Sequence, residues 1–237
     1  MMADDSLFYA ADLDASLIAL DEEESRHLAG VLRRKAGDTL QLCDGQGRSC
    51  LAEIVEVGKR ALFARALHPI PAPAPNPALL RLAVAPTKHA DRIEWLVEKA
   101  VEIGVRRITP LLCERSERRV LRTDRLQKIA LSAMKQSKRL WLPRIDELTP
   151  FPVFLKNEND VAQRFIAECG PAPKPHLFGA LERGALCCVL IGPEGDFSPA
   201  EVALALEHGY GAVSLGAARL RTETAALSAV MIAAMSR

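Results

Sequence analysis

The sequence lacks most of the features that mark secreted, membrane or metal-binding proteins. Its six cysteines are scattered without a C-x-x-C pair, and its five histidines show no ligand spacing. This usage is typical of reduced thiols and argues against a structural metal site. No apolar run approaches the length of a membrane span, and Met1–Ala10 lacks the basic and apolar regions of a signal peptide. We therefore expect a cytoplasmic protein with no metal and no membrane partner.

A strong excess of one charge is also missing, because the formal net charge is only +1. Binding to nucleic acid would therefore depend on local patches and not on a global field. One such patch is residues 113–144, which contain ten lysines and arginines but only three acids. This could equally be the solvated face of an ordinary helix. The hydrophobic content of 49% is sufficient for a real core.

Short β-prone runs dominate the first part of the chain. Asp38–Cys43, Ser49–Val57 and Arg60–Leu67 are separated by glycine-containing turns, which predicts a small β-barrel over residues 1–68. Five prolines then fall between residues 68 and 77. Because proline disrupts helices and sheet ladders, residues 69–77 are predicted to form an extended linker. Residues 78–237 make up the second predicted domain.

The second domain alternates between strand and helix patterns. Strands are predicted at Leu79–Ala85, Arg106–Leu112, His176–Ala180, Leu186–Ile191 and Ala212–Leu215. Helices are predicted at Asp91–Ile103, Asp124–Ser137 and about Glu158–Glu168. This alternation is typical of an α/β fold with a mostly parallel sheet covered by helices.

Two glycine-bearing loops follow strands of this domain and run directly into helices. The first is Gly192–Gly195, before a capping box at Ser198 with proline at the first helical position. The second is Leu215–Arg221, before a helix for which Thr222 is the expected N-cap. Loops at the carboxyl ends of strands are where open α/β sheets bind ligands, and glycine lets a ligand approach the backbone. We therefore predict a binding site between these loops.

The exact strings in the two loops are more specific than their composition. Gly-Pro-Glu-Gly at 192–195, Leu-Gly at 215–216 and Leu-Arg-Thr-Glu-Thr-Ala at 220–225 resemble the C-terminal signature of the ribosomal RNA small subunit methyltransferase E family. Further matching strings cover nearly the whole chain, including His-Leu-x-x-Val-Leu-Arg from residue 27 and Gln-Ser-x-Arg from residue 136.

This resemblance implies a fold and an activity. The family has a SPOUT-type methyltransferase domain, in which a C-terminal trefoil knot forms the methyl-donor pocket, and a PUA-like N-terminal β-barrel. Its members methylate N3 of a uridine in 16S ribosomal RNA of the small subunit with S-adenosylmethionine, and they work as homodimers. Two alternatives remain open: ribose 2′-O-methylation of tRNA or rRNA by another SPOUT enzyme, and a non-catalytic RNA-binding factor for ribosome assembly.

The resemblance also implies roles for individual residues. The expected cofactor-binding residues are Leu177, Phe178, Gly179, Ile191, Gly192, Pro193, Glu194, Gly195, Leu215, Gly216, Leu220 and Thr224. The expected catalytic residues are Arg221 and Arg139, as cations that stabilise the uridine anion or its phosphate, and Glu194 or Glu223, as the proton acceptor. For Glu223, an acid favoured at a helix N-terminus is an equal alternative. The expected RNA-binding residues are Arg26, Arg33, Arg34, Lys35, Lys88, Arg92, Arg115 and Arg139.

Two positions depart from the family pattern. Asp196 stands where the family usually has a second glycine, which changes the backbone freedom of the loop or adds a charge near the cofactor. Ala218 occupies the place of a usual arginine, and Arg219 that of an aliphatic residue. The arginine has either moved by one position or lost its role.

Overall fold

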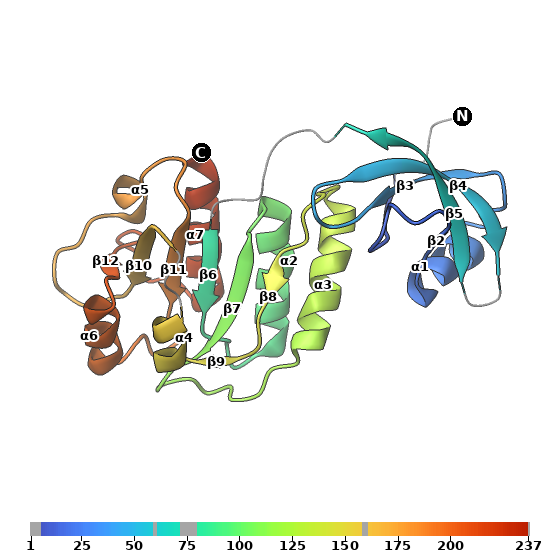
Figure 1. Cartoon of the computed structure of the whole chain (residues 1–237). Coiled ribbons are helices and arrows are strands. Elements are labelled where there is room, and N and C mark those ends of the chain that lie inside the picture. The colour runs from blue at the N-terminus through green and yellow to red at the C-terminus, as the bar shows by residue number, and fades with distance from the viewer. Residues whose placement is uncertain (1–5, 59–60, 72–79, 158–160, 237) are drawn as a thin grey trace. The chain divides into compact units, whose positions relative to one another are not determined.

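The computed structural model describes residues 6–58, 61–71, 80–157 and 161–236. The chain forms two compact units (Figure 1). The first comprises residues 1–76 together with 132–142, and the second comprises residues 77–131 together with 143–237. The predicted boundary near residue 77 thus falls close to a change of unit. The sequence did not signal that residues 132–142 group with the N-terminal part.

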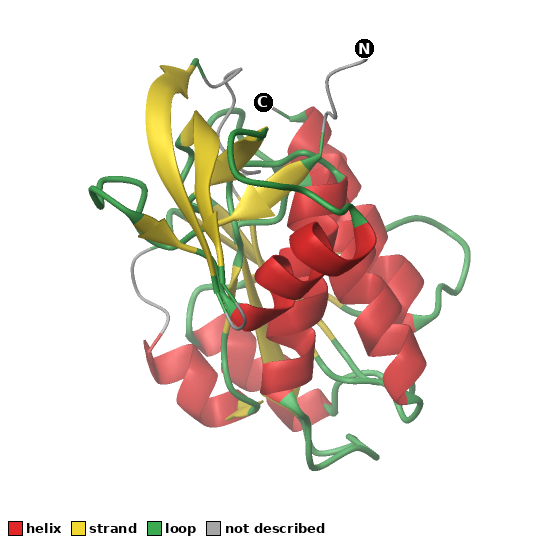
Figure 2. Cartoon of the chain, turned by 90° about the vertical axis from the view of Figure 1, so that its right-hand side faces the viewer, coloured by secondary structure: helices red, strands yellow, loops and turns green. Residues whose placement is uncertain are grey.

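The first unit is built on a curled five-stranded sheet with the order β1-β3-β4-β5-β2 (Figure 2). Its strands are β1 (Leu7–Tyr9), β2 (Ile18–Ala19), β3 (Thr39–Cys43), β4 (Ser49–Val57) and β5 (Leu62–Ile70). A short α-helix, α1 (Glu22–Arg26), continues into a π-helical turn, η1 (His27–Val31). Apolar side chains on one side of the sheet form the core of this unit, with Leu28, Leu42, Ile54 and Leu62 almost fully buried.

The start of the predicted linker is part of the sheet. Pro69 and Ile70 continue β5 and pair with Cys50 and Ser49 of β4. The prediction that proline excludes a ladder is therefore wrong at Pro69. Proline is tolerated here because β2 pairs with β5 only near Phe63 and Ala64, so the sheet does not need a donor from Pro69 on the other side. Residues 72–77 of the linker lie outside the described residues.

The segment from the end of α3 (Thr123–Gln136) belongs to the first unit because it packs against the first sheet. Lys135 pairs with Glu24, which is 3% exposed. The indole of Trp141 lies against Gly47, where an added Cβ atom would come within 2.4 Å of the ring. Gly47 also has a left-handed φ of 95°, so the hairpin requires glycine at this position.

The second unit is a parallel sheet with the order β12-β10-β11-β6-β7-β8, and β9 pairs with the end of β7. The strands are β6 (Leu80–Val84), β7 (Arg107–Leu112), β8 (Arg144–Ile145), β9 (Thr149–Pro150), β10 (Gln163–Ala167), β11 (Cys187–Ile191) and β12 (Gly211–Val213). The central strand β11 is buried along its whole length, as expected for a parallel strand covered on both faces.

Helices cover both faces of this sheet. α2 (Ala90–Ile103) and α7 (Thr222–Met235) pack against each other, and α7 lies on β6 and β11. α4 (Phe151–Asn157) and α6 (Pro199–Glu207) pack together over a buried apolar cluster of this unit, which includes Phe151, Phe197 and Tyr210. The α/β prediction and the positions of α2, α3 and most strands are confirmed.

Two predicted elements are wrong. The expected helix at about 158–168 contains strand β10, which pairs with both β11 and β12. The expected strand at His176–Ala180 is the short helix α5 (Leu177–Ala180), preceded by a single bridge from His176 to Ser214. At β10 the pairing with two neighbouring strands decides the outcome, because such short apolar segments fit helix and strand patterns equally well.

The path of the chain after β12 is unusual. β12 lies at one edge of the sheet, yet α7, which follows it, packs on β6 in the middle of the sheet. The connecting loop must therefore cross β10 and β11. This return to the centre is the path that the expected trefoil knot requires.

Candidate functional site

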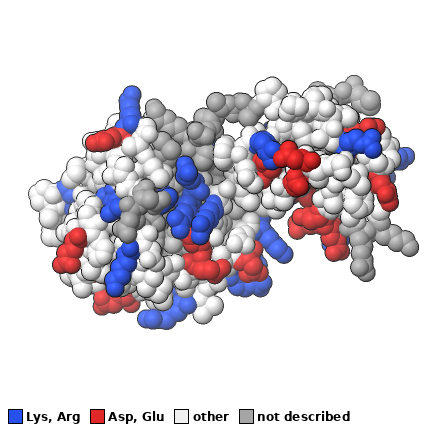
Figure 3. All heavy atoms as spheres, in the orientation of Figure 1, with Lys and Arg blue, Asp and Glu red and all other residues white. Residues whose placement is uncertain are grey.

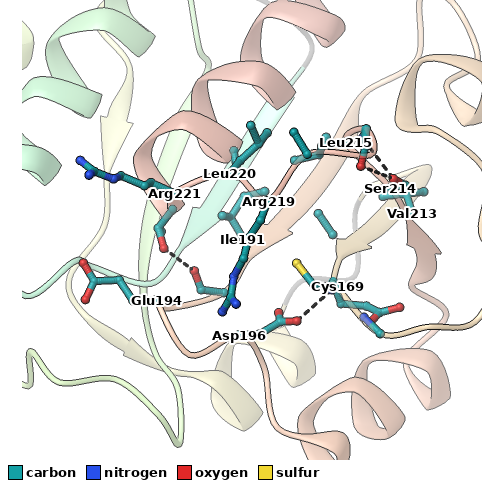
Figure 4. Close-up of a pocket in the computed structure, with 18 of the residues that line it drawn as sticks. Cys169, Ile191, Glu194, Asp196, Val213, Ser214, Leu215, Arg219, Leu220 and Arg221 are labelled. Carbon is teal, nitrogen blue, oxygen red and sulfur yellow. Dashed lines mark hydrogen bonds between the residues drawn. The ribbon is translucent and has the colours of Figure 1, made fainter.

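A cavity of about 990 Å³ lies in the second unit, at the carboxyl ends of β10, β11 and β12. Because these three neighbouring strands are parallel, the loops that follow them meet at one edge of the sheet. The lining residues come from three stretches, within 167–174, 191–196 and 213–222, together with Arg92 of α2 and Ala225 of α7. The two predicted loops thus form one site, and the loop after β10 adds a third wall (Figure 4).

The first loop is held in place by its packing. Phe197 is 4% exposed and its ring packs on that of Phe151, with centroids 5.3 Å apart. Gly192 lies so close that an added Cβ atom would be 3.0 Å from the backbone nitrogen of Phe197. The predicted capping box at Ser198 is confirmed, with Glu201 accepting from the Ser198 N–H and Ser198 accepting from the Glu201 N–H. Glycine at 192 is therefore a packing requirement of this loop.

The second loop leaves most of its backbone donors available. Among the described residues, the N–H groups of Leu215 and of residues 217–220 donate to no protein group. Gly216 has a left-handed φ of 128° with open space where a side chain would stand. Bare N–H groups next to a glycine can read the edge of a flat polar ligand. The geometry therefore suits a ligand with a heteroaromatic ring.

Thr222 joins the two loops. Its hydroxyl donates to the Gly192 carbonyl oxygen at 3.2 Å, and the residue is buried. The prediction of Thr222 as the N-cap of the last helix is wrong, because α7 starts at Thr222 and its N-cap is Arg221. The hydroxyl that could have capped the helix is instead used to tie the loop after β12 to the loop after β11.

Arg92 connects the pocket to two acids. Its Nη1 atom lies 3.3 Å from Glu194 Oε1, and its Nε atom lies 3.8 Å from Glu223 Oε1. Glu223 is only 7% exposed, and its Oε2 atom has no hydrogen-bond partner among the described residues. Glu194 lines the pocket, whereas Glu223 does not and contacts the pocket only through Arg92. The sequence placed Arg92 only at the RNA surface, because nothing local in a helix sequence shows what its tertiary neighbours will be.

Asp196 and Cys169 link the first loop to the loop after β10. The Asp196 carboxylate accepts a hydrogen bond of 2.8 Å from the Cys169 N–H, drawn as a dashed line in Figure 4. Burial raises the pKa of the Cys169 thiol, the Asp196 charge raises it further, and Arg219 opposes the shift. Both Asp196 and Arg219 line the cavity, so the two departures from the family pattern meet in the same pocket.

Comparison with known proteins places this fold and pocket in a family. The family described as RNA methyltransferase domain matches residues 74–234, and the RNA methyltransferase PUA domain matches residues 20–67. A Ribosomal RNA small subunit methyltransferase E of Rickettsia conorii is 30% identical over 204 residues, which cover 84% of this chain and 82% of the relative. The chain belongs to the ribosomal RNA small subunit methyltransferase E family. The predicted recognition and the SPOUT-type fold with a PUA-like N-terminal domain are thereby confirmed.

Solved structures agree with this assignment. The "probable rRNA-methyltransferase" of Porphyromonas gingivalis is 38% identical with a TM-score of 0.86, and the match covers 95% of each chain. The Neisseria gonorrhoeae member of the family, crystallised bound to S-adenosyl methionine, is 30% identical with a TM-score of 0.84. That match covers 95% of this chain and 94% of the Neisseria chain. The chain is thus similar to family members over nearly its full length.

The cavity includes most of the predicted cofactor residues but not all. Ile191, Gly192, Pro193, Glu194, Leu215, Gly216 and Leu220 line it. The expected wall at Leu177, Phe178 and Gly179 does not, because these residues form α5, in which Leu177 is buried and Phe178 points to solvent. Gly195 and Thr224 are also outside the lining. Gly195 instead accepts, through its carbonyl oxygen, a hydrogen bond of 2.8 Å from Arg115.

The predicted catalytic and RNA-binding residues divide between the two units. Arg221 lines the cavity, and in Figure 4 it points away from Asp196. Arg139 lies in the first unit, so its proposed role next to the pocket stays a prediction. In the second unit, Lys88 pairs with Glu117, and Arg115 also donates to the Phe197 carbonyl oxygen. In the first unit, Arg26 pairs with Glu22, while Arg33 and Lys35 are exposed and Arg34 is half-buried.

The surface shows no large region of a single charge sign on the face drawn in Figure 3, where basic and acidic side chains are interspersed. This agrees with the net charge of +1. In the described part of the chain, no cluster of three or more His, Cys, Asp or Glu could hold a metal ion. No helix there is long and apolar enough to span a membrane.

Proposed function

We propose that this protein transfers the methyl group of S-adenosylmethionine to N3 of a uridine in 16S ribosomal RNA, in the cytoplasm. The observation that carries the proposal is the pocket formed by the loops after β10, β11 and β12 in a chain of this family. The Neisseria relative of the same fold was crystallised with that cofactor. The residues present fit it: bare N–H groups for the adenine ring, and apolar walls at Ile191 and Leu220.

Seven predicted residues stay in the proposed cofactor site: Ile191, Gly192, Pro193, Glu194, Leu215, Gly216 and Leu220. The structure adds Val213, Ala225 and the loop 167–174 to the same walls. When bound, S-adenosylmethionine supplies an electrophilic methyl carbon. The role of these residues is to hold that carbon in line with the uridine N3, because orientation supplies much of the rate of a group transfer.

The uridine must lose its N3 proton, and the resulting anion must be stabilised. Arg92 and Arg221 both line the pocket, and a fixed cation next to a developing negative charge lowers the barrier. Arg92 is held from two sides by Glu194 and Glu223. We assign Arg92 and Arg221 as the stabilising cations, with Glu223 as a positioning residue for Arg92.

The proton acceptor in this proposal is Glu194. Its side chain is 38% exposed and lines the cavity, so a uridine bound in the pocket can reach it. Glu223 is buried behind Arg92 and has no such access. We expect Glu194→Gln to lower kcat by about a hundredfold, the usual range for loss of a general base, and to affect the affinity for S-adenosylmethionine much less, because glutamine keeps the size of the side chain in the cofactor site. Equal kcat in this variant and the wild type would exclude Glu194 as the base.

The PUA-like unit is proposed to bind the RNA backbone through Arg26, Arg33, Arg34 and Lys35. The Arg26–Glu22 pair is exposed, and such surface pairs are weak enough to exchange for a phosphate. Neutralising these side chains should weaken RNA binding without changing cofactor affinity, and it should reduce the dependence of RNA affinity on salt.

We also propose that the protein works as a homodimer. Met231 and Met235 on α7 are 46% and 68% exposed, and Trp95 on the neighbouring helix α2 is 46% exposed. Glu223 is the single charged residue within α7, so the outer face of this helix is uncharged and presents these two methionines. Exposed apolar side chains that lie together are typical of protein interfaces. Sedimentation of the wild type and of Met231→Lys tests the proposal, with a dimer expected only for the wild type.

The reaction is tested by incubating the protein with S-adenosylmethionine and either free 16S rRNA or small subunits that lack the modification. The RNA is then digested and its nucleosides identified by mass spectrometry. The expected product is 3-methyluridine. A 2′-O-methylated nucleoside would instead assign the chain to ribose methylation, and RNA binding without any methylated product would assign it to ribosome assembly.

A further inference from the structure

Of the acids that line the cofactor pocket, one forms no ion pair with a lysine or arginine among the described residues. Three acids line the cavity: Glu168, Glu194 and Asp196. Glu168 pairs with Lys174, and Glu194 pairs with Arg92. Within the described residues, Asp196 forms no ion pair. A negative charge therefore faces the cavity at this point.

The position of the Asp196 carboxylate is fixed by the backbone around it. Its two oxygens accept hydrogen bonds of 2.8 Å, one from the Cys169 N–H and one from the Phe197 N–H. The Asp196 N–H in turn donates to the Pro193 carbonyl oxygen. The residue has a left-handed φ of 63°, which glycine adopts most easily and which aspartate and asparagine tolerate. The turn itself would accept glycine, so the carboxylate is an addition to the pocket and not a requirement of the turn.

Arg219 is a cation that lines the same cavity as this carboxylate. In Figure 4 its side chain extends toward the end of the pocket where Asp196 and Cys169 lie. Arg219 is exposed, so water screens its charge more strongly than that of the half-buried Asp196. The end of the pocket near Asp196 therefore keeps a negative character.

We infer that Asp196 makes this pocket selective for the positively charged methyl donor over its neutral product. The inference rests on the proposed function. In the transfer, a bond forms between N3 and the methyl carbon, and the bond from that carbon to sulfur breaks with its electron pair left on sulfur. The sulfonium of S-adenosylmethionine thus becomes the neutral thioether of S-adenosylhomocysteine, and the N3 proton leaves to a base.

A carboxylate at the pocket wall attracts the sulfonium charge of the first ligand, and this attraction is absent for the uncharged thioether of the second. The electrostatic attraction is lost at the moment of transfer, so the product leaves more readily than the donor. Product inhibition by S-adenosylhomocysteine is correspondingly weak.

Calorimetry with three ligands tests this inference on the full chain. The ligands are S-adenosylmethionine, S-adenosylhomocysteine and sinefungin, which carries an ammonium group in place of the methylsulfonium. Asp196→Asn keeps the tolerance for a left-handed backbone and an oxygen acceptor for the Cys169 N–H, but removes the charge. We expect its Kd to rise about tenfold for the two cationic ligands, and by less than about twofold for S-adenosylhomocysteine.

Two further variants serve as controls. Glu207→Gln removes an exposed acid at the end of α6, outside the cavity, and should leave all three affinities unchanged. Asp196→Gly keeps the turn and loses both the charge and the bond to Cys169. It should show the same selective loss for the cationic ligands, and circular dichroism of each variant confirms folding.

The outcomes separate the inference from the proposed function. An equal loss of affinity for all three ligands in Asp196→Asn would show that Asp196 only shapes the loop, and it would overturn the inference. Unchanged affinities would overturn it as well. If the wild type binds none of the three ligands, the proposed function itself fails. Selective weakening of the two cationic ligands is the single result that supports the inference.

Discussion

Replacement of Arg92 by alanine should destabilise the second unit because it leaves Glu223 buried without a counter-ion. Glu223 is 7% exposed, and one of its carboxylate oxygens already lacks a hydrogen-bond partner among the described residues. Removing one member of a buried ion pair is costly, since the remaining charge stays desolvated. The effect should be much larger than that of breaking an ion pair at the surface.

The expected magnitude follows from the geometry. Two unit charges separated by the 3.8 Å between Arg92 Nε and Glu223 Oε1 attract by about 4 kcal/mol at an effective dielectric constant of about 20. Arg92 is 31% exposed, so solvent reduces this value. We expect Arg92→Ala to lower the free energy of unfolding by about 1–3 kcal/mol. Lys99→Ala provides a matched control, because Lys99 lies on the same helix and pairs with Glu98 and Glu102 at the surface. Its loss should cost about 0.5 kcal/mol or less.

Urea unfolding in a double-mutant cycle measures the interaction directly. Trp95 lies on α2 and reports on the second unit once Trp141, in the first unit, is replaced by phenylalanine in every protein compared. In the background of Arg92→Ala, adding Glu223→Gln should recover part of the lost stability, since it removes the uncompensated charge. Additivity of the two changes within about 0.5 kcal/mol would refute the argument that Arg92 holds the charge of Glu223.

Three other predictions concern the loops. Phe197→Ala should lower the free energy of unfolding by about 3–5 kcal/mol, measured in urea, because it opens a cavity under the first loop; a loss below about 1 kcal/mol would contradict the packing described for Phe197. Thr222→Val should lower the free energy of unfolding by about 1–3 kcal/mol and weaken S-adenosylmethionine binding in calorimetry, since the buried Gly192 carbonyl loses its donor. An unchanged Kd would show that this hydrogen bond does not shape the pocket. Cys169 is the one exposed thiol among the six cysteines, so iodoacetamide should label it alone. Because its pKa is raised above the ordinary thiol value of 9.0, labelling followed by mass spectrometry should be slow at neutral pH and faster as pH rises, and faster still in Asp196→Asn; a rate that is already maximal at neutral pH would contradict this.

The elements that the sequence predicted well are those with strong local signals. β4 was expected at Ser49–Val57 and has those bounds, and the capping box at Ser198 starts α6 as expected. The two loops at 192–195 and 215–221 carry their glycines at turns, which local sequence determines directly. These loops were sufficient to predict a pocket and, with their exact strings, the family.

The features that were missed depend on tertiary neighbours. β10 is a strand because β11 and β12 supply partners on both sides, and its own sequence does not exclude a helix. The third wall of the pocket was missed because of the same error, since a helix ending near residue 168 would not direct the next loop to the strand ends. Arg92 and Glu223 meet through the packing of α2 on α7, which no spacing along the chain reveals. The grouping of residues 132–142 with the first unit likewise depends on contacts such as Trp141 with Gly47.

The return of α7 to the middle of the sheet has a consequence for how the protein is made. β6 is the first strand of the domain to leave the ribosome, and the helix that covers it is made only after all the strands of the domain. Until α7 emerges, the nascent domain exposes an apolar sheet face, and neither the tie from Thr222 to Gly192 nor the pocket wall at Ala225 exists. Contacts between such distant segments make folding slow. A nascent chain stalled before α7 should therefore bind chaperones and fail to bind the methyl donor, so that cofactor binding requires α7 to have been made.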